Sequence, residues 1–463
     1  MRPNLILVTV ECWRADHFGA LTPRLTDFSR ESSVFTEAQT CGGWTRISMT
    51  SLMSSAYASM YGGPNLALGT PARRTLAECL LENGYWTAGY TANPVCGTIG
   101  GFHRGFARYG EPNRKLPLPS GAPTDWKAEW PRLLEMGIPP RDTRSTVDAE
   151  ALTDLGIRFF QAQPPGDPWF LWLHYLDPHW PCQMAIRPST PEALRHAWED
   201  VVTYREKVIP SRGTFDPGGQ ARARWIRRYR ECIDSTDQEI GRLLDELRKR
   251  TDWDRTIVAI TADHGEELFE RGTWHHSWNQ LHREGVHVPL ILRVPGIAPR
   301  SVDVPVGLID IAPTFLDYAG IAAPAPMIGR SLRPIIDGER VEARPVFSEM
   351  MGHDDSSSYR LAIRDGEWKY IYDFEHPRDS KLFRISDDPG ETVNLRTSNP
   401  GLFRGFEQMR LAHVTLGLVG LMERANESRD TRLPAAAADA SGDDFGIHTN
   451  EIVREQMEAL GYL

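Results

Sequence analysis

The sequence predicts an α/β protein in which helices lie on both sides of a mostly parallel central sheet. Apolar runs of strand length alternate with segments of helical period, which is typical of strands joined by crossover helices. The chain has 463 residues, of which 41% are hydrophobic and 25% are charged. Because one core stops growing at roughly 250 to 300 residues, we expect one large domain with a smaller attachment.

The expected elements follow from these patterns in chain order. The strands are the apolar and β-branched runs at residues 5–10, 86–91, 169–173, 257–261 and 290–294. The helices are the segments with apolar residues at helical spacing, at residues 22–31, 48–54, 75–83, 147–162 and 221–249.

The sequence pattern changes in the C-terminal part, where signals of β-hairpins begin at about residue 344. Residues 360–364 and 368–372 flank Asp365-Gly366, a turn of the kind that joins antiparallel strands. Further on, small and polar residues are typical of a flexible linker. The predicted parts are a large domain, a small antiparallel-sheet subdomain, a linker and a C-terminal docking helix, at 1–343, 344–425, 426–450 and 451–463.

Charge and hydropathy exclude several classes of protein. The formal net charge is -10, which argues against binding of nucleic acid or of an anionic membrane through a broad basic field. No apolar stretch reaches the roughly 18 residues of a membrane span, and the N-terminus lacks the pattern of a signal peptide. We therefore expect a cytoplasmic protein without nucleic-acid or membrane partners, and the oligomeric state stays open. Six scattered cysteines without a CxxC pair indicate buried free thiols.

Polar residues that follow the expected strands are the first candidates for a site, because ligands of α/β sheets bind beyond the carboxyl ends of strands. Glu11 follows the first strand, and Asp263 and His264 follow the strand at 257–261. A carboxylate and an imidazole at a strand end suit a divalent metal, and Gly265 permits the turn that lets both face one ion. The alternatives are a helix-capping or solvent-facing Glu11 and a surface Asp-His pair.

Two further segments bring histidines toward the same edge. The strand at 169–173 continues into a proline-shaped loop with His174 and His179. His179 lies beyond the strand and is the expected functional residue, whereas His174 could be satisfied at the strand edge. His275 and His276 precede the strand at 290–294 and could bind substrate or donate a proton to a leaving group.

A glycine turn at Gly42-Gly43 opens the helix at 48–54 and places Thr45 near its start. The N-terminus of a helix offers unpaired N–H groups and a positive dipole end, which favour a phosphoryl or sulfuryl oxygen. Thr45 would then lie at the anion site. The alternative is that Thr45 or Ser48 is simply an N-cap.

Together these segments resemble the sulfatase branch of the alkaline phosphatase superfamily over nearly the whole chain. The matching stretches are PNLILVTVECWRADHFG, WTRISMTSLMSS, TLAECLLENGYWTAGYTANP, FLWLHYLDPHWP, CIDSTDQEIGRLLDEL, TADHGEELFERGTWHHSWNQLHREGVHVPLILRVPG, LIDIAPTFLDYAGI, AIRDGEWKYIY, LFRISDDPGETVNL and EALGYL. The resemblance implies an alkaline-phosphatase-like sheet between helices with a small C-terminal sheet, and it makes 1–343 the catalytic domain.

Carried over by position, the resemblance implies a role for each candidate residue. The implied metal ligands are Glu11, Thr45, Asp263 and His264, with Thr45 also the nucleophile. The implied substrate-binding residues are Arg46, His179 and His276, and the two histidines are also the implied catalytic imidazoles.

The sequence departs from the family pattern at two places. Typical sulfatases carry Cys or Ser in a C/S-x-P-x-R motif, whereas residues 45–49 here read TRISM. Typical sulfatases also have paired aspartates where this chain has Val10-Glu11. The set of Glu, Thr, Asp and His resembles the single-metal phosphotransfer members, so we expect one divalent ion, with Mn²⁺ or Zn²⁺ ranked before Ca²⁺ or Mg²⁺.

Three functions are compatible with these residues. The first is a hydrolase or phosphotransferase that acts on a small anionic phosphate or phosphonate ester, with attack by Thr45 and a covalent intermediate. The second is a sulfatase that works with an unmodified threonine. The third is a non-catalytic, sulfatase-like binding protein. The substrate loops are expected at 96–142 and 182–220.

Overall fold

The computed structural model describes most of the chain. The described residues are 1–61, 73–98, 100–111, 147–180, 182, 190–208, 210–211, 213–276, 281–325, 327–351 and 359–430. Much of the expected substrate loops therefore lies outside the described residues. So do most of the expected linker at 426–450 and the whole of the expected docking helix at 451–463.

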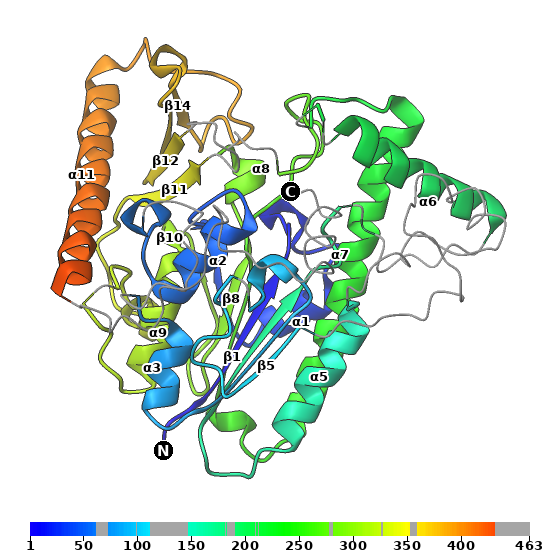
Figure 1. Ribbon diagram of the computed structural model, residues 1–463, viewed down its shortest axis with the longest axis vertical. Coiled ribbons are helices and arrows are strands. Elements are labelled where there is room, and N and C mark those ends of the chain that lie inside the picture. Colours follow the sequence, from blue (N-terminus) through cyan, green and yellow to red (C-terminus); the bar gives the residue numbers. More distant parts are fainter. Residues whose placement is uncertain are drawn as a thin grey trace.

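An eight-stranded sheet forms the centre of the protein (Figure 1). Its strands, in spatial order, are β5 (Arg108–Gly110), β4 (Trp86–Thr91), β6 (Trp169–Tyr175), β1 (Asn4–Val10), β7 (Thr256–Ala262), β8 (Leu290–Arg293), β2 (Ser33–Phe35) and β9 (Arg300–Val302). All neighbours are parallel except that β8 runs antiparallel to both β7 and β2. The prediction of a mostly parallel sheet is thus confirmed.

Helices cover both faces of this sheet. Those on one face are α2 (Thr45–Ser54), α3 (Leu76–Glu82) and α9 (Ile311–Tyr318), and those on the other are α1 (Pro23–Ser29), α5 (Ala149–Gln161) and α7 (Gly219–Arg248). Helix α5 begins where Asp148 accepts a hydrogen bond from the N–H of Ala151, and α3 begins with a capping box between Thr75 and Glu78.

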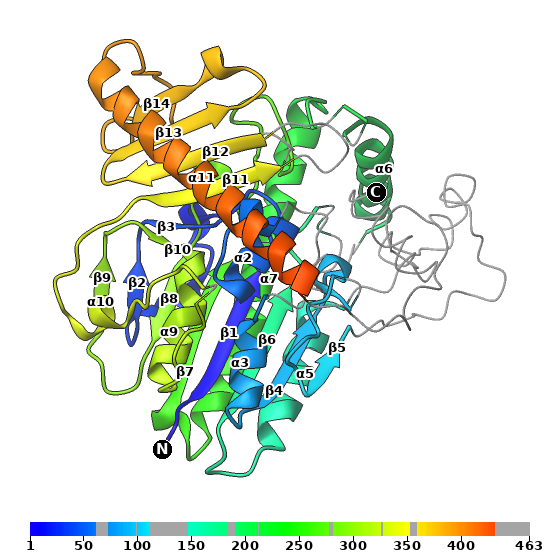
Figure 2. The same cartoon turned by 60° about the vertical axis from the view of Figure 1, so that its left-hand side comes forward.

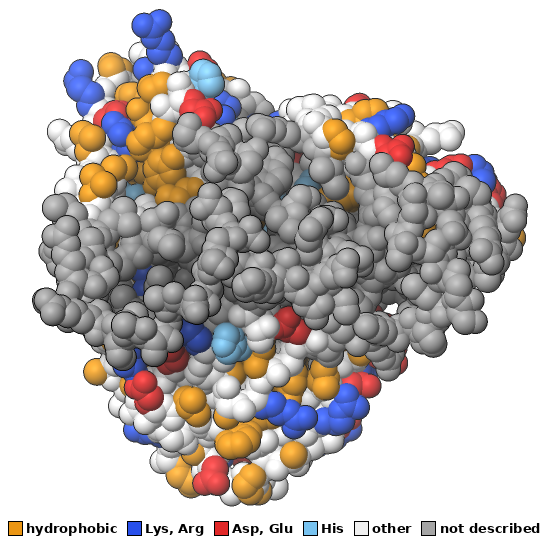
Figure 3. Space-filling view, viewed as in Figure 1, with side chains coloured by type: hydrophobic (Ala, Val, Ile, Leu, Met, Phe, Trp, Pro, Cys, Tyr) orange, Lys and Arg blue, Asp and Glu red, His pale blue; other side chains and the backbone are white. Residues whose placement is uncertain are grey.

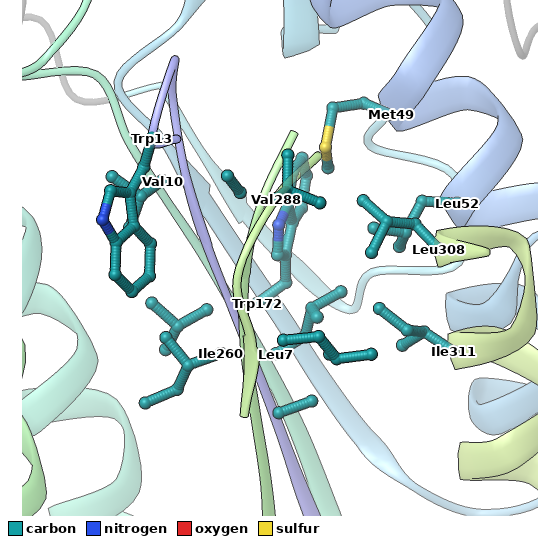
Figure 4. Packing of buried hydrophobic residues seen from close by; sticks show 14 of the residues in the cluster. Leu7, Val10, Trp13, Met49, Leu52, Trp172, Ile260, Val288, Leu308 and Ile311 are labelled. Carbon is teal, nitrogen blue, oxygen red and sulfur yellow. The ribbon is translucent and has the colours of Figure 1, made fainter. Parts of the chain in front are cut away.

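The main core lies on both sides of the central strands. Every residue of β1, β6 and β7 is buried, as expected for parallel strands covered on both faces. Figure 4 shows Leu52 and Ile311 packed on the helix α2 and α9 side of the strands, and Trp13 and Ile260 on the other side. This packing fixes the strand ends on which the site is built.

Shorter elements complete the large domain. The helices are α6 (Pro191–Thr203), α8 (Arg283–Val286) and α10 (Arg333–Asp337), with a π-helical segment at Tyr204–Val208. The short 3-10 helices are Ala15–His17, Ala58–Tyr61, Pro94–Cys96, Trp253–Arg255, Leu308–Asp310 and Pro377–Asp379. Strands β3 (Ala38–Gln39) and β10 (Val306–Gly307) form a small parallel pair. Helix α6 falls within the predicted loop at 182–220 and was not expected.

The C-terminal part is a four-stranded antiparallel sheet covered by a long helix (Figure 2). The strands are β11 (Val346–Met351), β12 (Tyr359–Asp365), β13 (Trp368–Asp373) and β14 (Lys381–Arg384), and the helix is α11 (Pro400–Asp430). Gly366 adopts φ 53° in the predicted turn between β12 and β13. The sheet joins the large domain through β11, where the N–H of Glu349 donates to the carbonyl of Cys41 at 2.8 Å.

The expectations from composition concerned the cysteines, the charged surface and membrane-spanning helices. All six cysteines are buried free thiols, as predicted. On the face shown in Figure 3, the described Lys, Arg, Asp and Glu side chains are interspersed. No helix among the described residues is both long and apolar enough to cross a membrane.

Candidate active site

The candidate site lies at the carboxyl ends of β1, β6 and β7. Val10, the last residue of β1, is in register with Tyr175 of β6 and Ala262 of β7. The next residues, Glu11 and Asp263, therefore leave the sheet side by side, and the N–H of Asp263 donates to the carbonyl of Val10 at 3.3 Å. Both side chains are fully buried. Glu11 is thus not a solvent-facing residue, and Asp263 is not part of a surface pair.

Four side chains surround the carboxylate of Glu11. Its Oε1 accepts a hydrogen bond from the hydroxyl of Thr45 and lies 3.5 Å from Nε2 of His264. Its Oε2 lies 2.7 Å from Nε2 of His174 and accepts a hydrogen bond from Nδ2 of Asn93 at 3.0 Å. Burial alone would raise the pKa of Glu11, but the hydrogen bonds from His174 and His264 hold it well below its usual value.

Asp263 is fixed by the backbone at one oxygen and open at the other. Its Oδ1 accepts hydrogen bonds from the N–H groups of Cys12 at 3.1 Å and His264 at 2.7 Å. Its Oδ2 lies 3.3 Å from Nε2 of His264 and has no hydrogen-bond partner among the described residues. Burial and the neighbouring Glu11 raise the pKa of Asp263 to about 7. A cation between these carboxylates would remove their repulsion.

The ring of His264 is held so that one nitrogen faces the carboxylates. Its Nδ1 lies 2.8 Å from the carbonyl oxygen of Gly265, which directs Nε2 toward Glu11 and Asp263. Burial would lower the pKa of His264, but Asp263 and Glu11 raise it to about 9. Gly265 is required by close packing, because a Cβ there would lie 1.9 Å from the carbonyl oxygen of Glu284.

The residues present fit a divalent metal ion. Ligand atoms of Glu11, Asp263 and His264 all lie within 4.8 Å of one another, and all three residues are buried. The open Oδ2 of Asp263 and the backbone-bound imidazole of His264 are features of metal ligands with ordered outer contacts. Two carboxylates, a hydroxyl and one imidazole form a donor set that manganese or zinc accepts.

Thr45 is the first residue of α2 and is fully buried. The N-cap is Trp44, so Thr45 does not cap the helix; its Oγ1 lies 3.3 Å from Nε2 of His264 and donates to Glu11. Ser48 does not cap it either, because its hydroxyl donates to the carbonyl of Asp263. The capping alternative is therefore wrong for both residues.

Three histidines gather beside these groups. The ring centroids of His179 and His276 are 5.0 Å apart, those of His264 and His276 are 4.5 Å apart, and those of His275 and His276 are 3.6 Å apart. Burial lowers the pKa of His179 to about 4, and burial together with His275 lowers the pKa of His276 well below its usual value. His179 and His276 are therefore neutral imidazoles at pH 7.

Arg46 follows Thr45 on α2 and is half-buried. Burial lowers the pKa of its guanidinium, and it makes no ion pair with a carboxylate in the described part of the chain. A partly desolvated cation of this kind suits an anionic ligand.

The site contains contributors that the sequence did not identify. Asn93 and Glu266 were not among the candidates, and the structure places the first against Glu11 and the second 3.4 Å from Nδ1 of His275. His174 was one of the histidines expected at this edge, with satisfaction at the strand edge as the alternative, and its Nε2 lies 2.7 Å from Oε2 of Glu11. Asn93 lies just beyond β4, so the rule that polar residues follow strands could have found it.

The chain is similar in sequence to known proteins. The family model "Sulfatase" matches residues 3–321, and "N-sulphoglucosamine sulphohydrolase, C-terminal" matches residues 272–402. Choline-sulfatase of Rhizobium meliloti (strain 1021) is 30% identical over 283 residues, which are 57% of this chain and 54% of that protein. The chain thus matches about half the length of this relative. The multifunctional alkaline phosphatase superfamily protein PehA of Trinickia caryophylli is 25% identical over 483 residues, 85% of this chain and 91% of that protein.

Solved structures share the fold at lower identity. A putative sulfatase from Bacteroides thetaiotaomicron has a TM-score of 0.70 at 18% identity, covering 94% of this chain and 96% of that one. The phosphonate monoester hydrolase from Silicibacter pomeroyi has a TM-score of 0.66 at 21% identity, covering 89% and 95%. These likenesses confirm the predicted fold. The match of the family model to most of the chain shows that this protein belongs to the sulfatase branch of the alkaline phosphatase superfamily.

Proposed function

We propose that this protein is a metal-dependent hydrolase of phosphate or phosphonate esters that uses Thr45 as its nucleophile. The observation that carries the proposal is the contact of the Thr45 hydroxyl with Glu11, at the first residue of α2 and 3.3 Å from Nε2 of His264. Relatives and structural neighbours that act on sulfate or phosphonate esters support a reaction at an ester of this kind.

Glu11, Asp263, His264 and the hydroxyl of Thr45 would hold a divalent cation, with manganese or zinc preferred. Bound there, the cation supplies Lewis acidity that favours the ionised hydroxyl and offsets the negative charge of the phosphoryl oxygens. Asn93 and His174 keep the carboxylate of Glu11 in place through its second oxygen.

The chain's own groups would then bind and orient the ester. The N-terminus of α2 presents backbone N–H groups and a positive dipole end to the phosphoryl oxygens. Arg46 adds a positive charge that no described carboxylate neutralises. Such preorganised charges contribute most of the catalysis in phosphoryl transfer.

The reaction has two displacements. The bond from Thr45 Oγ1 to phosphorus forms while the bond to the leaving oxygen breaks. His276, neutral at rest, takes up the proton that the Thr45 hydroxyl loses and gives it to the leaving oxygen, which returns the ring to its neutral form. His179 lies on the same side and binds the ester oxygens. Water then attacks phosphorus, which releases the phosphate product and restores the hydroxyl of Thr45. An alcohol in place of water would make the protein a phosphotransferase.

The second candidate is a sulfatase with an unmodified threonine, favoured by the family match and by the choline-sulfatase relative. Initial rates separate the two. Protein stripped of metal and reloaded with manganese, zinc, magnesium or calcium is assayed on bis-p-nitrophenyl phosphate and on p-nitrophenyl sulfate. We expect faster cleavage of the phosphate diester, whereas faster cleavage of the sulfate ester would favour the second candidate.

Matched variants test the role of Thr45 in either reaction. Thr45→Val keeps the shape of the side chain without the hydroxyl, and Thr45→Ser keeps the hydroxyl. We expect turnover to survive in the serine variant and to be lost in the valine variant. Turnover that survives Thr45→Val, or that survives exhaustive chelation, would overturn the proposal. If the wild type showed no turnover with any of the metals, the third candidate, a non-catalytic protein, would be favoured.

A further inference from the structure

We propose that a second divalent cation, of the zinc class, binds beside the first site and is held by His179, His275 and His276. This inference goes beyond the proposed function, which needs one cation held by Glu11, Asp263 and His264. It assigns the neighbouring histidines to a site of their own.

The three histidines converge from two segments far apart in the chain. One ring nitrogen from each of the three lies within 4.8 Å of the corresponding nitrogens of the other two. Three nitrogens around one tetrahedral zinc are roughly 3.4 Å apart, given Zn–N bonds of about 2.0 to 2.1 Å. Rotation of the rings that brings these nitrogens closer together would place all three in one coordination sphere.

Each ring has an outer contact of the kind that metal-binding imidazoles make. Nε2 of His275 also lies 3.2 Å from the hydroxyl of Tyr204, a contact that a cation on this nitrogen would replace. Nδ1 of His179 lies 2.6 Å from the carbonyl oxygen of Trp180, so Nδ1 carries the hydrogen and Nε2 is an acceptor. Oε2 of Glu266 lies 3.4 Å from Nδ1 of His275 and 3.5 Å from Nδ1 of His276. A carbonyl or carboxylate on the second ring nitrogen is the usual partner of a histidine that binds metal.

Glu266 gives an independent reason for a cation. It is 1% exposed, and its Oε1 has no hydrogen-bond partner in the described parts of the chain. A buried carboxylate that is incompletely paired is costly unless a positive charge lies close by. A divalent cation on the adjacent imidazoles would supply that charge.

The backbone also positions the cluster. His275 adopts the left-handed region at φ 79°, although it is not glycine. This conformation places its ring 3.6 Å from that of His276. Such a conformation persists where the surroundings hold it, and it places two imidazoles side by side over Glu266.

The donor set selects the class of cation. Three imidazoles favour zinc, cobalt, nickel or copper over magnesium and calcium, which prefer oxygen ligands. The two sites adjoin at Cys12, whose Sγ lies 3.6 Å from Nδ1 of His276 and which forms a close group with His264 and His276. In the protein with both cations His179 and His276 are ligands, so the ester-binding and proton-transfer roles given above belong to the protein with one cation.

Metal stoichiometry tests the inference without substrate. Metal-stripped protein is titrated with zinc by calorimetry, and zinc per chain is measured after gel filtration. We expect two zinc ions for the wild type and one for His179→Gln, His275→Gln or Asp263→Asn. The control His413→Gln, a buried histidine outside the cluster, keeps two. A single zinc ion in the wild type, or two in the His179 and His275 variants, would overturn the inference.

Cobalt(II) binding to the unmodified protein avoids the question of whether a variant folds. We expect two successive titration steps in the visible absorption spectrum, and the step for the histidine cluster persists in excess magnesium. One step alone would contradict the second site. Since neither readout uses turnover, the second site can fail while Thr45 is active, and it can stand while Thr45 is inert.

Discussion

Nε2 of His174 lies 2.7 Å from Oε2 of Glu11, and both side chains are fully buried at the carboxyl ends of the central strands. The other ring nitrogen of His174 lies 2.8 Å from the hydroxyl of Thr9, which in turn accepts a hydrogen bond from the indole of Trp172 at 3.0 Å. A chain of contacts inside the sheet thus fixes the carboxylate that faces Thr45. Residues that only hold a metal ligand in this way affect metal affinity without touching substrate.

The first prediction concerns His174. His174→Leu removes one of the two partners of Glu11 Oε2, so we expect metal affinity at the first site to fall by about 10- to 100-fold. His174→Gln retains an N–H donor and loses less. The measurement is competition with a chelator of known affinity. His413→Leu is the matched control, because His413 lies 2.7 Å from the buried Glu349 away from the site. If the metal affinity of His174→Leu were unchanged, the contact of His174 with Glu11 would have no part in metal binding.

The second prediction concerns Arg46. Its guanidinium is half-buried, and burial lowers its pKa. Arg46→Gln removes this charge, so we expect inhibition by inorganic phosphate to weaken by about 10- to 100-fold, as for loss of a hydrogen bond to a charged group. The melting temperature should stay the same or rise, because a desolvated charge is removed. Arg30→Gln, at a solvated position, is the control. Unaltered phosphate inhibition would exclude Arg46 from the anion site.

The third prediction concerns Gly265. In Gly265→Ala the new Cβ would lie 1.9 Å from the carbonyl oxygen of Glu284, so the backbone that anchors the ring of His264 must shift. We expect a loss of stability of about 2 kcal/mol or more together with weaker metal binding. Gly219→Ala is the matched control, since it lies at the start of α7 with nothing within 4 Å of its Cβ. Denaturant titration with and without metal measures the stability and the metal binding of each variant. Equal stability of the two variants would contradict the close packing of Gly265 against Glu284.

The fourth prediction is a pH dependence of stability that His287 causes. Burial and then Arg283 lower the pKa of His287 to about 4, with Lys369 acting in the same direction and Glu37 opposing it. The unfolded chain takes up a proton near pH 6.5 and the folded chain does not, so stability is full above about pH 6.5 and falls as the pH drops toward 4. The loss at pH 5 from this group is on the order of 2 kcal/mol.

His287→Gln tests this contribution, because the glutamine amide can replace the ring N–H that lies 2.7 Å from the carbonyl of Thr36. We expect the fall in unfolding free energy between pH 7.5 and pH 5 to be smaller in the variant by about that amount. Urea titrations at the two pH values measure it. Equal pH slopes for wild type and variant would show that folding does not lower the pKa of His287.

The central strands were predictable because buried parallel strands have nearly continuous apolar sequences. Expected strands at 86–91 and 290–294 agree with β4 (Trp86–Thr91) and β8 (Leu290–Arg293) to within one residue. Helix α11 was not expected, since Leu411, Leu416 and Leu418 are exposed on it and its apolar residues form no single stripe. Its position on the small sheet depends on tertiary contacts, such as that of Phe406 with Tyr370, which sequence periodicity does not contain.

The site residues that directly follow strands were predictable from the sequence. Those whose place depends on the pairing register between strands were not. Glu11 and Asp263 follow strands, and the alignment of β1 with β7 places them together. The contact of His174 with Glu11 requires that His174 pair with Thr9 across β6 and β1, and Asn93 reaches the site because Thr91 pairs with the same histidine. Pairing over such sequence separations is fixed by the folded core and has no local signature.

The most direct test of the account is to look for a covalent group on Thr45 during turnover. Metal-loaded protein is quenched in acid while it cleaves bis-p-nitrophenyl phosphate, and peptides are analysed by mass spectrometry. The account predicts a nitrophenylphosphoryl group on Thr45 in the wild type, formed at the rate of the first nitrophenol burst and absent from Thr45→Val. Turnover without any group on Thr45, with Thr45→Val equally active, would contradict it.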